Sequence, residues 1–178
     1  MQFYFGVDVK TRHFSQTPLE RALKEKNTNI SKLIIDRVGD IEISDEDGLN
    51  PLHRAVDEGM LDVVDYLIKK GVNIQSKTKN GNTPLHIAAM DGHTEIAELL
   101  VENGADIHAR SENYHNCTPL QDAVLCSKLE VAKFLISVEE LFYTIRELLL
   151  TMPEVVPPSI GPCARIIVDM IQRQPIFS

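Results

Sequence analysis

Histidine and cysteine are the residue types in this sequence that could support catalysis. A nucleophilic cysteine needs a histidine base and an orienting carboxylate within hydrogen-bond distance. His115 and Cys117 share one short stretch of sequence, but nothing in the pattern around Cys117 would activate its thiol. Cys126 lies further from any histidine along the chain. We therefore predict no catalytic residues, and we predict that the protein is not an enzyme.

The sequence also contains no clear motif for binding a metal ion or a nucleotide. His108, His115, Cys117 and Cys126 form the densest group of potential metal ligands. Structural zinc sites usually pair their ligands as C-x₂-C or H-x₃₋₅-H, and neither spacing occurs in this sequence. The glycine-rich loops that hold nucleotide phosphates are absent as well. The prediction is that the protein uses no metal and no cofactor.

Length and charge limit the class of protein. The chain has 178 residues and a formal net charge of −8, from 18 basic and 26 acidic side chains. That length suits one compact domain or one short repeat array. The acidic balance argues against nucleic-acid binding, which depends on clustered Lys and Arg. No apolar run reaches the ~18 residues that a membrane span needs, so no membrane insertion is expected.

The cysteines and the amino-terminal residues indicate a compartment. Three cysteines are an odd and sparse set, which suits a reducing environment better than a disulfide framework. Residues 1–8 are too short and too acidic to act as a secretory signal. We expect a monomer in the cytoplasm, with the nucleus or the cytosol of a host cell left open.

An internal repeat organises most of the chain. A Thr/Asn-Pro-Leu motif occurs four times, and its prolines lie 33, 33 and 35 residues apart. Apolar residues follow each motif at nearly the same offset. A glycine with a nearby Asn or Asp and an Ile then follows in the second and third repeats, and less clearly in the first at Gly39. Three features that recur with the same spacing along the chain indicate a repeated structural unit. The four motif prolines are Pro18, Pro51, Pro84 and Pro119.

The third repeat predicts a pair of short helices. Thr83 is a good N-cap and Pro84 fits the first helical position, where its missing N–H costs nothing. Asp91-Gly92 should end that helix, and a second helix should run from Thr94 to Glu102. Helices of this length are not stable alone in water. Each pair must bury its apolar face against its neighbours in the stack.

These motifs resemble those of the ankyrin repeat family, whose period is 33 residues and whose signature is T-P-L-H-x-A. The resemblance implies an all-α solenoid of stacked helix-turn-helix units with β-turn or hairpin tips. It also implies a non-catalytic module that binds another protein. The expected repeats are 17–49, 50–82, 83–117 and 118–138, and residues 1–16 are expected to form the tail of a preceding degenerate repeat or an N-terminal cap. Within the repeats, we expect His53 and His86 to hydrogen-bond turn groups and join adjacent repeats.

Residues 139–178 follow a different pattern, and two interpretations stay open. Apolar residues at helical spacing over 141–149 predict a helix that covers repeat four, and 164–171 predict another short helix after four prolines. The first interpretation is a helical cap. The second is a recruitment segment, because 152–155 faintly resemble the start of an F-box and 159–163 an elongin-binding box. The chain would then be an adaptor for ubiquitin-ligase machinery.

The resemblance also implies where a partner would bind, namely the turn tips and the inner helix faces. Repeat two offers carboxylates there, which favours a partner with a basic segment, and repeat four offers aromatic and apolar groups. A further alternative is an inhibitor that sequesters a basic partner protein. The candidate partner-binding residues are Glu46, Asp47, Leu49, Asp57, Glu58, Lys79, Asn80, Asn82, Met90, Asp91, Tyr114, His115 and Leu125.

Overall fold

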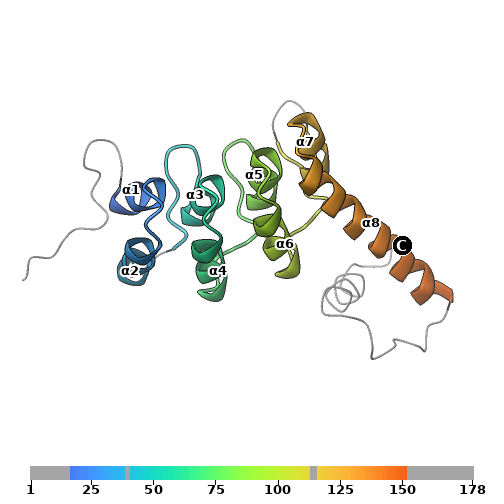
Figure 1. Ribbon diagram of the computed structural model, residues 1–178, viewed down its shortest axis with the longest axis horizontal. Helices are drawn as coiled ribbons and strands as arrows, with labels where there is room; N and C mark the ends of the chain where they lie inside the picture. Colours follow the sequence, from blue (N-terminus) through green and yellow to red (C-terminus); the bar gives the residue numbers. More distant parts are fainter. Residues whose placement is uncertain (1–16, 39–40, 113–115, 152–178) are drawn as a thin grey trace, which may run out of the picture.

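The computed structural model describes residues 17–38, 41–112 and 116–151, and within these ranges the chain forms helices and no strand (Figure 1). The helices come in pairs, one pair for each predicted repeat. They are α1 (Pro18–Lys24), α2 (Thr28–Val38), α3 (Pro51–Asp57), α4 (Leu61–Lys69), α5 (Pro84–Asp91), α6 (Thr94–Glu102), α7 (Pro119–Leu125) and α8 (Leu129–Thr151).

The first helix of every pair begins in the same way. Its N-cap residue has an extended backbone, and a proline occupies the first helical position. The prediction that the four motif prolines open equivalent hairpins is therefore confirmed. The ends predicted for repeat three are also confirmed, since α5 ends at Asp91, Gly92 is left-handed with φ 84°, and α6 runs from Thr94 to Glu102. The N-caps are Thr17, Asn50, Thr83 and Thr118.

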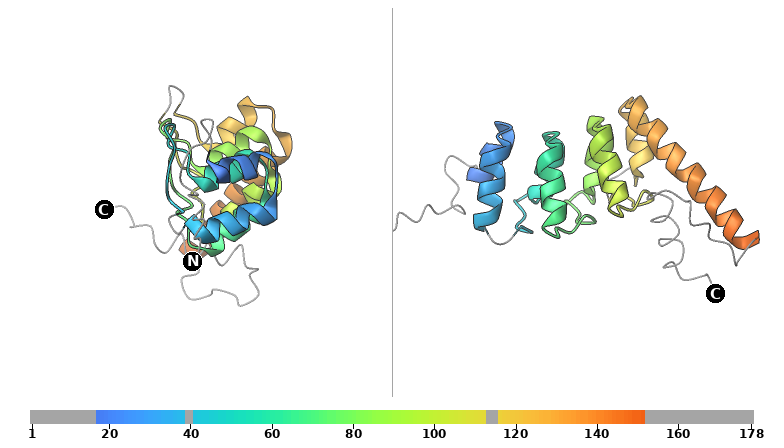
Figure 2. Two further views of the ribbon diagram at one scale, coloured as in Figure 1. Left: turned by 90° about the vertical axis from the view of Figure 1, so that its left-hand side faces the viewer. Right: turned by 60° about the horizontal axis from the view of Figure 1, so that its bottom comes forward.

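The helices form two layers. The first helices pack on one another in the order α1, α3, α5, α7, and the second helices in the order α2, α4, α6, α8. Viewed along the stack, the pairs overlie one another and the connecting segments gather on one side (Figure 2). Between the layers lies one continuous apolar core, in which Leu52, Leu67, Leu85 and Leu100 have almost no exposed surface. Burial of that core against neighbouring pairs stabilises helices that are individually too short.

The segment before each of α3, α5 and α7 is closed by two hydrogen bonds at one anchoring residue, whose N–H donates and whose side chain accepts. The N–H of Asp45 donates to the carbonyl of Leu49 over 3.0 Å, and the N–H of Leu49 donates back to the Asp45 carboxylate over 2.9 Å. Thr78 makes the same two bonds with Asn82, and Ser111 makes them with Cys117. These closed turns are the tips that the resemblance implies.

Neighbouring tips are joined by backbone hydrogen bonds. The N–H of Lys79 donates to the carbonyl of Asp47 over 3.0 Å, and the N–H of Glu112 donates to the carbonyl of Asn80 over the same distance. The tips therefore form a continuous row along one side of the stack. Movement of one tip would have to break a bond to the next.

The carboxyl-terminal region departs from the predicted division. The boundary expected between residues 138 and 139 falls inside α8, which continues without a break to Thr151. Glu139 stands where repeat three has Gly104, so no residue with glycine's conformational freedom ends the helix there. The expected helix at 164–171, the two faint recruitment motifs and the segment 1–16 lie outside the described residues. None of the helices in the described ranges is long and apolar enough to cross a membrane.

Candidate functional site

His53 hydrogen-bonds a turn group in the connection that follows its own pair of helices, as predicted. Its imidazole is fully buried at the start of α3, where Nδ1 accepts a hydrogen bond from the N–H of Asn50 over 3.3 Å. The opposite nitrogen, Nε2, lies 3.1 Å from the carbonyl oxygen of Ser76, in the segment that leads to α5. The ring caps one helix and holds the following connection.

His86 repeats this arrangement one unit further along. Its Nδ1 accepts from the N–H of Thr83 over 3.1 Å, and its Nε2 lies 3.1 Å from the carbonyl oxygen of Cys117. Repeats one and four have Glu20 and Gln121 at this position, and these side chains make the capping bond to the N–H of Thr17 and Thr118. The structure therefore assigns the two histidines to the scaffold, and the prediction that they hydrogen-bond turn groups is confirmed. Each ring ties its own helix pair to the connection that leads to the next pair.

Both buried histidines are expected to make the free energy of unfolding depend on pH. Burial lowers the pKa of His53 and of His86 below the ordinary value of about 6.5, although their carbonyl contacts act in the opposite direction. Between the lowered pKa and about 6.5 the unfolded chain binds more protons than the folded chain, so the free energy of unfolding falls as the pH drops below about 6.5. Urea midpoints measured from about pH 7.5 to about pH 5.5 should show this decrease.

The double variant His53→Gln, His86→Gln tests the origin of that dependence. Glutamine keeps the capping bond, as Gln121 does in repeat four, and it does not titrate. The variant should be less stable at neutral pH and should lose less stability on acidification. An equally steep decrease in wild type and variant would contradict the assignment.

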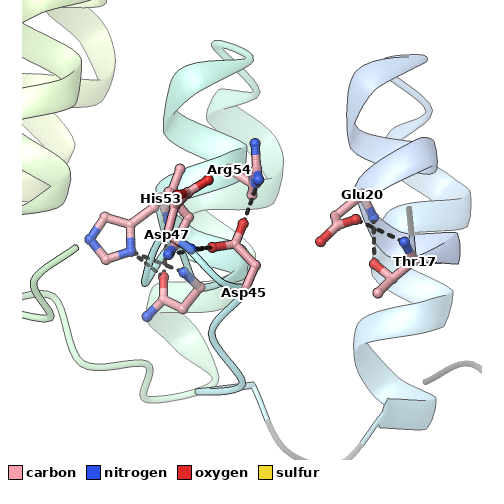
Figure 3. A network of polar contacts seen from close by, with 8 residues as sticks. Thr17, Glu20, Asp45, Asp47, His53 and Arg54 are labelled. Carbon is pink, nitrogen blue, oxygen red and sulfur yellow. Dashed lines mark hydrogen bonds and ion pairs between the residues drawn. The ribbon is translucent and has the colours of Figure 1, made fainter. Parts of the chain in front are cut away.

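Asp45 and Arg54 contribute to the surface of repeat two, and the sequence-based list does not include them. Besides the N–H of Leu49, the Asp45 carboxylate accepts the N–H of Asp47 over 2.8 Å and pairs with the guanidinium of Arg54 (Figure 3). Burial alone would raise the pKa of Asp45, but these hydrogen bonds lower it. An Asp at the start of a polar turn is the signal that could have identified this anchor.

The candidate partner-binding residues fall into two rows. One row follows the tips, where Asp47, Lys79 and Asn80 are exposed and are held by the backbone bonds between tips. The other row follows the carboxyl ends of the first helices, at Asp57 and Glu58, Met90 and Asp91, and Leu125. Glu46, Leu49 and Asn82 belong to the tip row. Tyr114 and His115 lie outside the described residues, so the aromatic part of this surface stays a prediction.

The helix-end row brings carboxylates together. Partial desolvation and the negative charge of Asp57 raise the pKa of Asp91, although His93 and Lys128 act in the opposite direction. Among the ion pairs of the described residues, none involves Asp57, Glu58 or Asp91. All three lie at helix carboxyl ends, where the helix dipole already disfavours negative charge. A cation placed here would relieve both effects.

Cys117 is not placed for nucleophilic chemistry. Its side chain is buried, and burial raises the pKa of its thiol, as does the negative charge of Asp122. A nucleophilic cysteine needs the opposite shift. In the described part of the chain, no three His, Cys, Asp or Glu side chains gather as metal ligands would.

Comparison with known proteins agrees with the repeat geometry. A family model of ankyrin repeats in three copies matches residues 1–78 and 71–145. No curated protein matches the chain. The match covers all four pairs of helices and most of α8.

Proposed function

This chain belongs to the ankyrin repeat family, whose members are generally protein–protein interaction modules, and from that premise we propose that it is a non-catalytic scaffold that binds a basic segment of another protein. The proposed binding surface, here called the inner surface, consists of the tip row and the helix-end row. Such surfaces of stacked repeats are extended and concave. The scaffold would act as a monomer in the cytosol or nucleus, where its sparse cysteines stay reduced.

The observation that carries the proposal is the group of carboxylates in the helix-end row, where Asp57, Glu58 and Asp91 lie at helix carboxyl ends and none takes part in an ion pair of the described residues. The raised pKa of Asp91 means that its ionised form is disfavoured before a partner binds. A Lys or Arg side chain that bridges Asp57 and Asp91 would remove this penalty. Such charges mainly accelerate association and set the preference for a partner.

The same surface offers apolar contact beyond the carboxylates. Met90 is half-buried between its neighbours, and Leu125 at the equivalent position of repeat four is exposed. Methionine and other apolar groups at the centre of an interface supply buried contact area, while charges at the rim orient the partner. We therefore expect a partner segment with basic residues next to an apolar side chain.

Charge reversal on the inner surface tests this function. Partners captured from lysate by the wild-type chain would be identified by mass spectrometry, and one would be purified. With that partner, Asp57→Lys combined with Glu58→Lys should lower the association rate constant about tenfold at low salt, and the rate should become less sensitive to salt. Stopped-flow or surface plasmon resonance measurements at several salt concentrations provide the rates.

The matched control is Glu95→Lys combined with Glu98→Lys on α6. These two side chains are exposed on the second layer of helices, and the change in net charge is the same. If both double variants slow association equally, only the total charge matters and the inner surface is not the binding site. Circular dichroism should confirm that each variant keeps its helices.

A further inference from the structure

Repeat four leaves exposed a position that every earlier repeat buries. Leu23, Val56 and Ala89 occupy this position in α1, α3 and α5, and they are 1%, 0% and 0% exposed. The equivalent residue in α7, Val124, is 60% exposed. The difference arises because each earlier residue is covered by the next pair of helices, whereas no described helix follows α8.

The second layer has the same open end. Ile35 of α2 is 3% exposed, and Ile136, its equivalent in α8, is 44% exposed. Leu129 precedes Ile136 by seven residues, which places both on one face of the helix, and it is exposed as well. Val124, Leu129 and Ile136 together form what we call the open stacking face. All three side chains are apolar and exposed. Contiguous apolar patches on a protein surface commonly mark a contact site.

We propose that residues 164–171 of this chain pack on the open stacking face and complete the stack. This segment carries Ala164, Ile166, Ile167, Val168, Met170 and Ile171. It is the most apolar stretch after α8, and its spacing suits a helix of two turns. Two apolar surfaces would thus be removed from water in one contact.

The length of the intervening chain allows this return. Thr151, the last residue of α8, lies 15 residues beyond Ile136, which corresponds to about 22 Å of helix at 1.5 Å per residue. Residues 152–163 contain four prolines. Even as a stiff, proline-rich linker these 12 residues span about 37 Å, so the segment can reach back along α8 to the face.

The tether favours this occupant over a second copy of the chain. A short linker gives an attached segment an effective concentration on the order of mM. A free second molecule at µM concentration would have to bind about a thousandfold more tightly to compete. The contact is also independent of the inner surface, so its test does not depend on the partner proposed above.

Two native cysteines make the contact measurable in the full chain. Cys126 is exposed at the carboxyl end of α7, two residues after Val124, and Cys163 immediately precedes the apolar segment. A short bismaleimide should therefore link Cys126 to Cys163 within one molecule. Mass spectrometry of the digested monomer would identify the cross-linked peptides, and hydrogen–deuterium exchange of residues 164–171 would supply a second reading.

Two variants distinguish a specific contact with the open stacking face from chance proximity of the two cysteines. Val124→Lys should reduce the intramolecular cross-link at least fivefold and accelerate exchange in 164–171, without unfolding the chain, because this side chain is already exposed. Leu33→Lys is the matched control, since Leu33 is 58% exposed on α2 at the other end of the stack. It should change neither reading.

Three results would overturn the proposal. The first is a cross-link that forms only between two molecules and rises with concentration, which would assign the face to a second copy. The second is an equal cross-link in Val124→Lys and wild type. The third is the absence of both the cross-link and protection from exchange.

Discussion

Replacement of Gly81 by alanine is expected to lower the free energy of unfolding by about 3 kcal/mol or more. Gly81 lies in the tip before α5 with φ +76°, a conformation that disfavours any side chain. An added Cβ would lie 2.2 Å from the backbone nitrogen of Glu112, in the next tip. That nitrogen donates to the carbonyl of Asn80, so relief of the clash must break the bond between the two tips.

Gly104→Ala distinguishes the cost of the left-handed backbone from the cost of the clash with the next tip. Gly104 has an equally positive φ of +89°, but an added Cβ would meet nothing within 4 Å. This variant should lose only about 1 kcal/mol, the cost of the left-handed conformation. Urea unfolding followed by circular dichroism measures both. If the two variants are equally destabilised, the contact between tips contributes little to the stability of the stack.

His86→Ala should have the second largest effect, a loss of about 3 kcal/mol. The substitution removes a fully buried ring from the middle of the stack and leaves the N–H of Thr83 without its acceptor. The carbonyl of Cys117 keeps its bond from the N–H of Ser111, so it is not left unpaired. The expected loss therefore comes from the cavity and from the missing cap.

His86→Gln distinguishes the cap from the link between repeats. Glutamine at the equivalent position of repeat four makes the capping bond over 2.9 Å, so this variant should recover roughly half of the loss. His108→Ala, at a largely exposed site, should change stability by less than about 0.5 kcal/mol. A full recovery by glutamine would mean that the bond to the next repeat contributes nothing.

Much of the fold could be predicted because local signals and the repeat agree. An N-cap residue, a proline at the first helical position and a stop at Gly92 each determine the backbone over a few residues, and the 33-residue period repeats them. The role of His53 and His86 was predictable for the same reason, since a residue type that recurs at one position of a repeated unit usually serves the unit. The anchors Asp45, Thr78 and Ser111 were also available, because they recur every 33 residues and share a side-chain acceptor.

The inner surface was less predictable, because it depends on how one pair of helices is placed against the next. The sequence places Asp57 and Asp91 in equivalent regions of two repeats, but their mutual effect requires the distance across the stack. The length of α8 was missed for a different reason. A boundary was placed where the glycine of the repeat is lost, although the loss of a helix-ending residue favours continuation. The exposure of Val124 follows from what comes after it, which its own neighbours in sequence cannot reveal.

Because the tips are anchored at both ends, a change in loop length does not shift the helices of the next repeat. The loop from Ser111 to Cys117, before α7, has two residues more than the loop from Thr78 to Asn82, yet Ser111 closes it with the same two bonds that Thr78 makes. The extra residues are confined between these pinned ends, and α7 still packs on α5. Foreign peptides inserted at this point should therefore be displayed without disturbing the helices, which makes this tip a natural place for sequence diversification and for grafting.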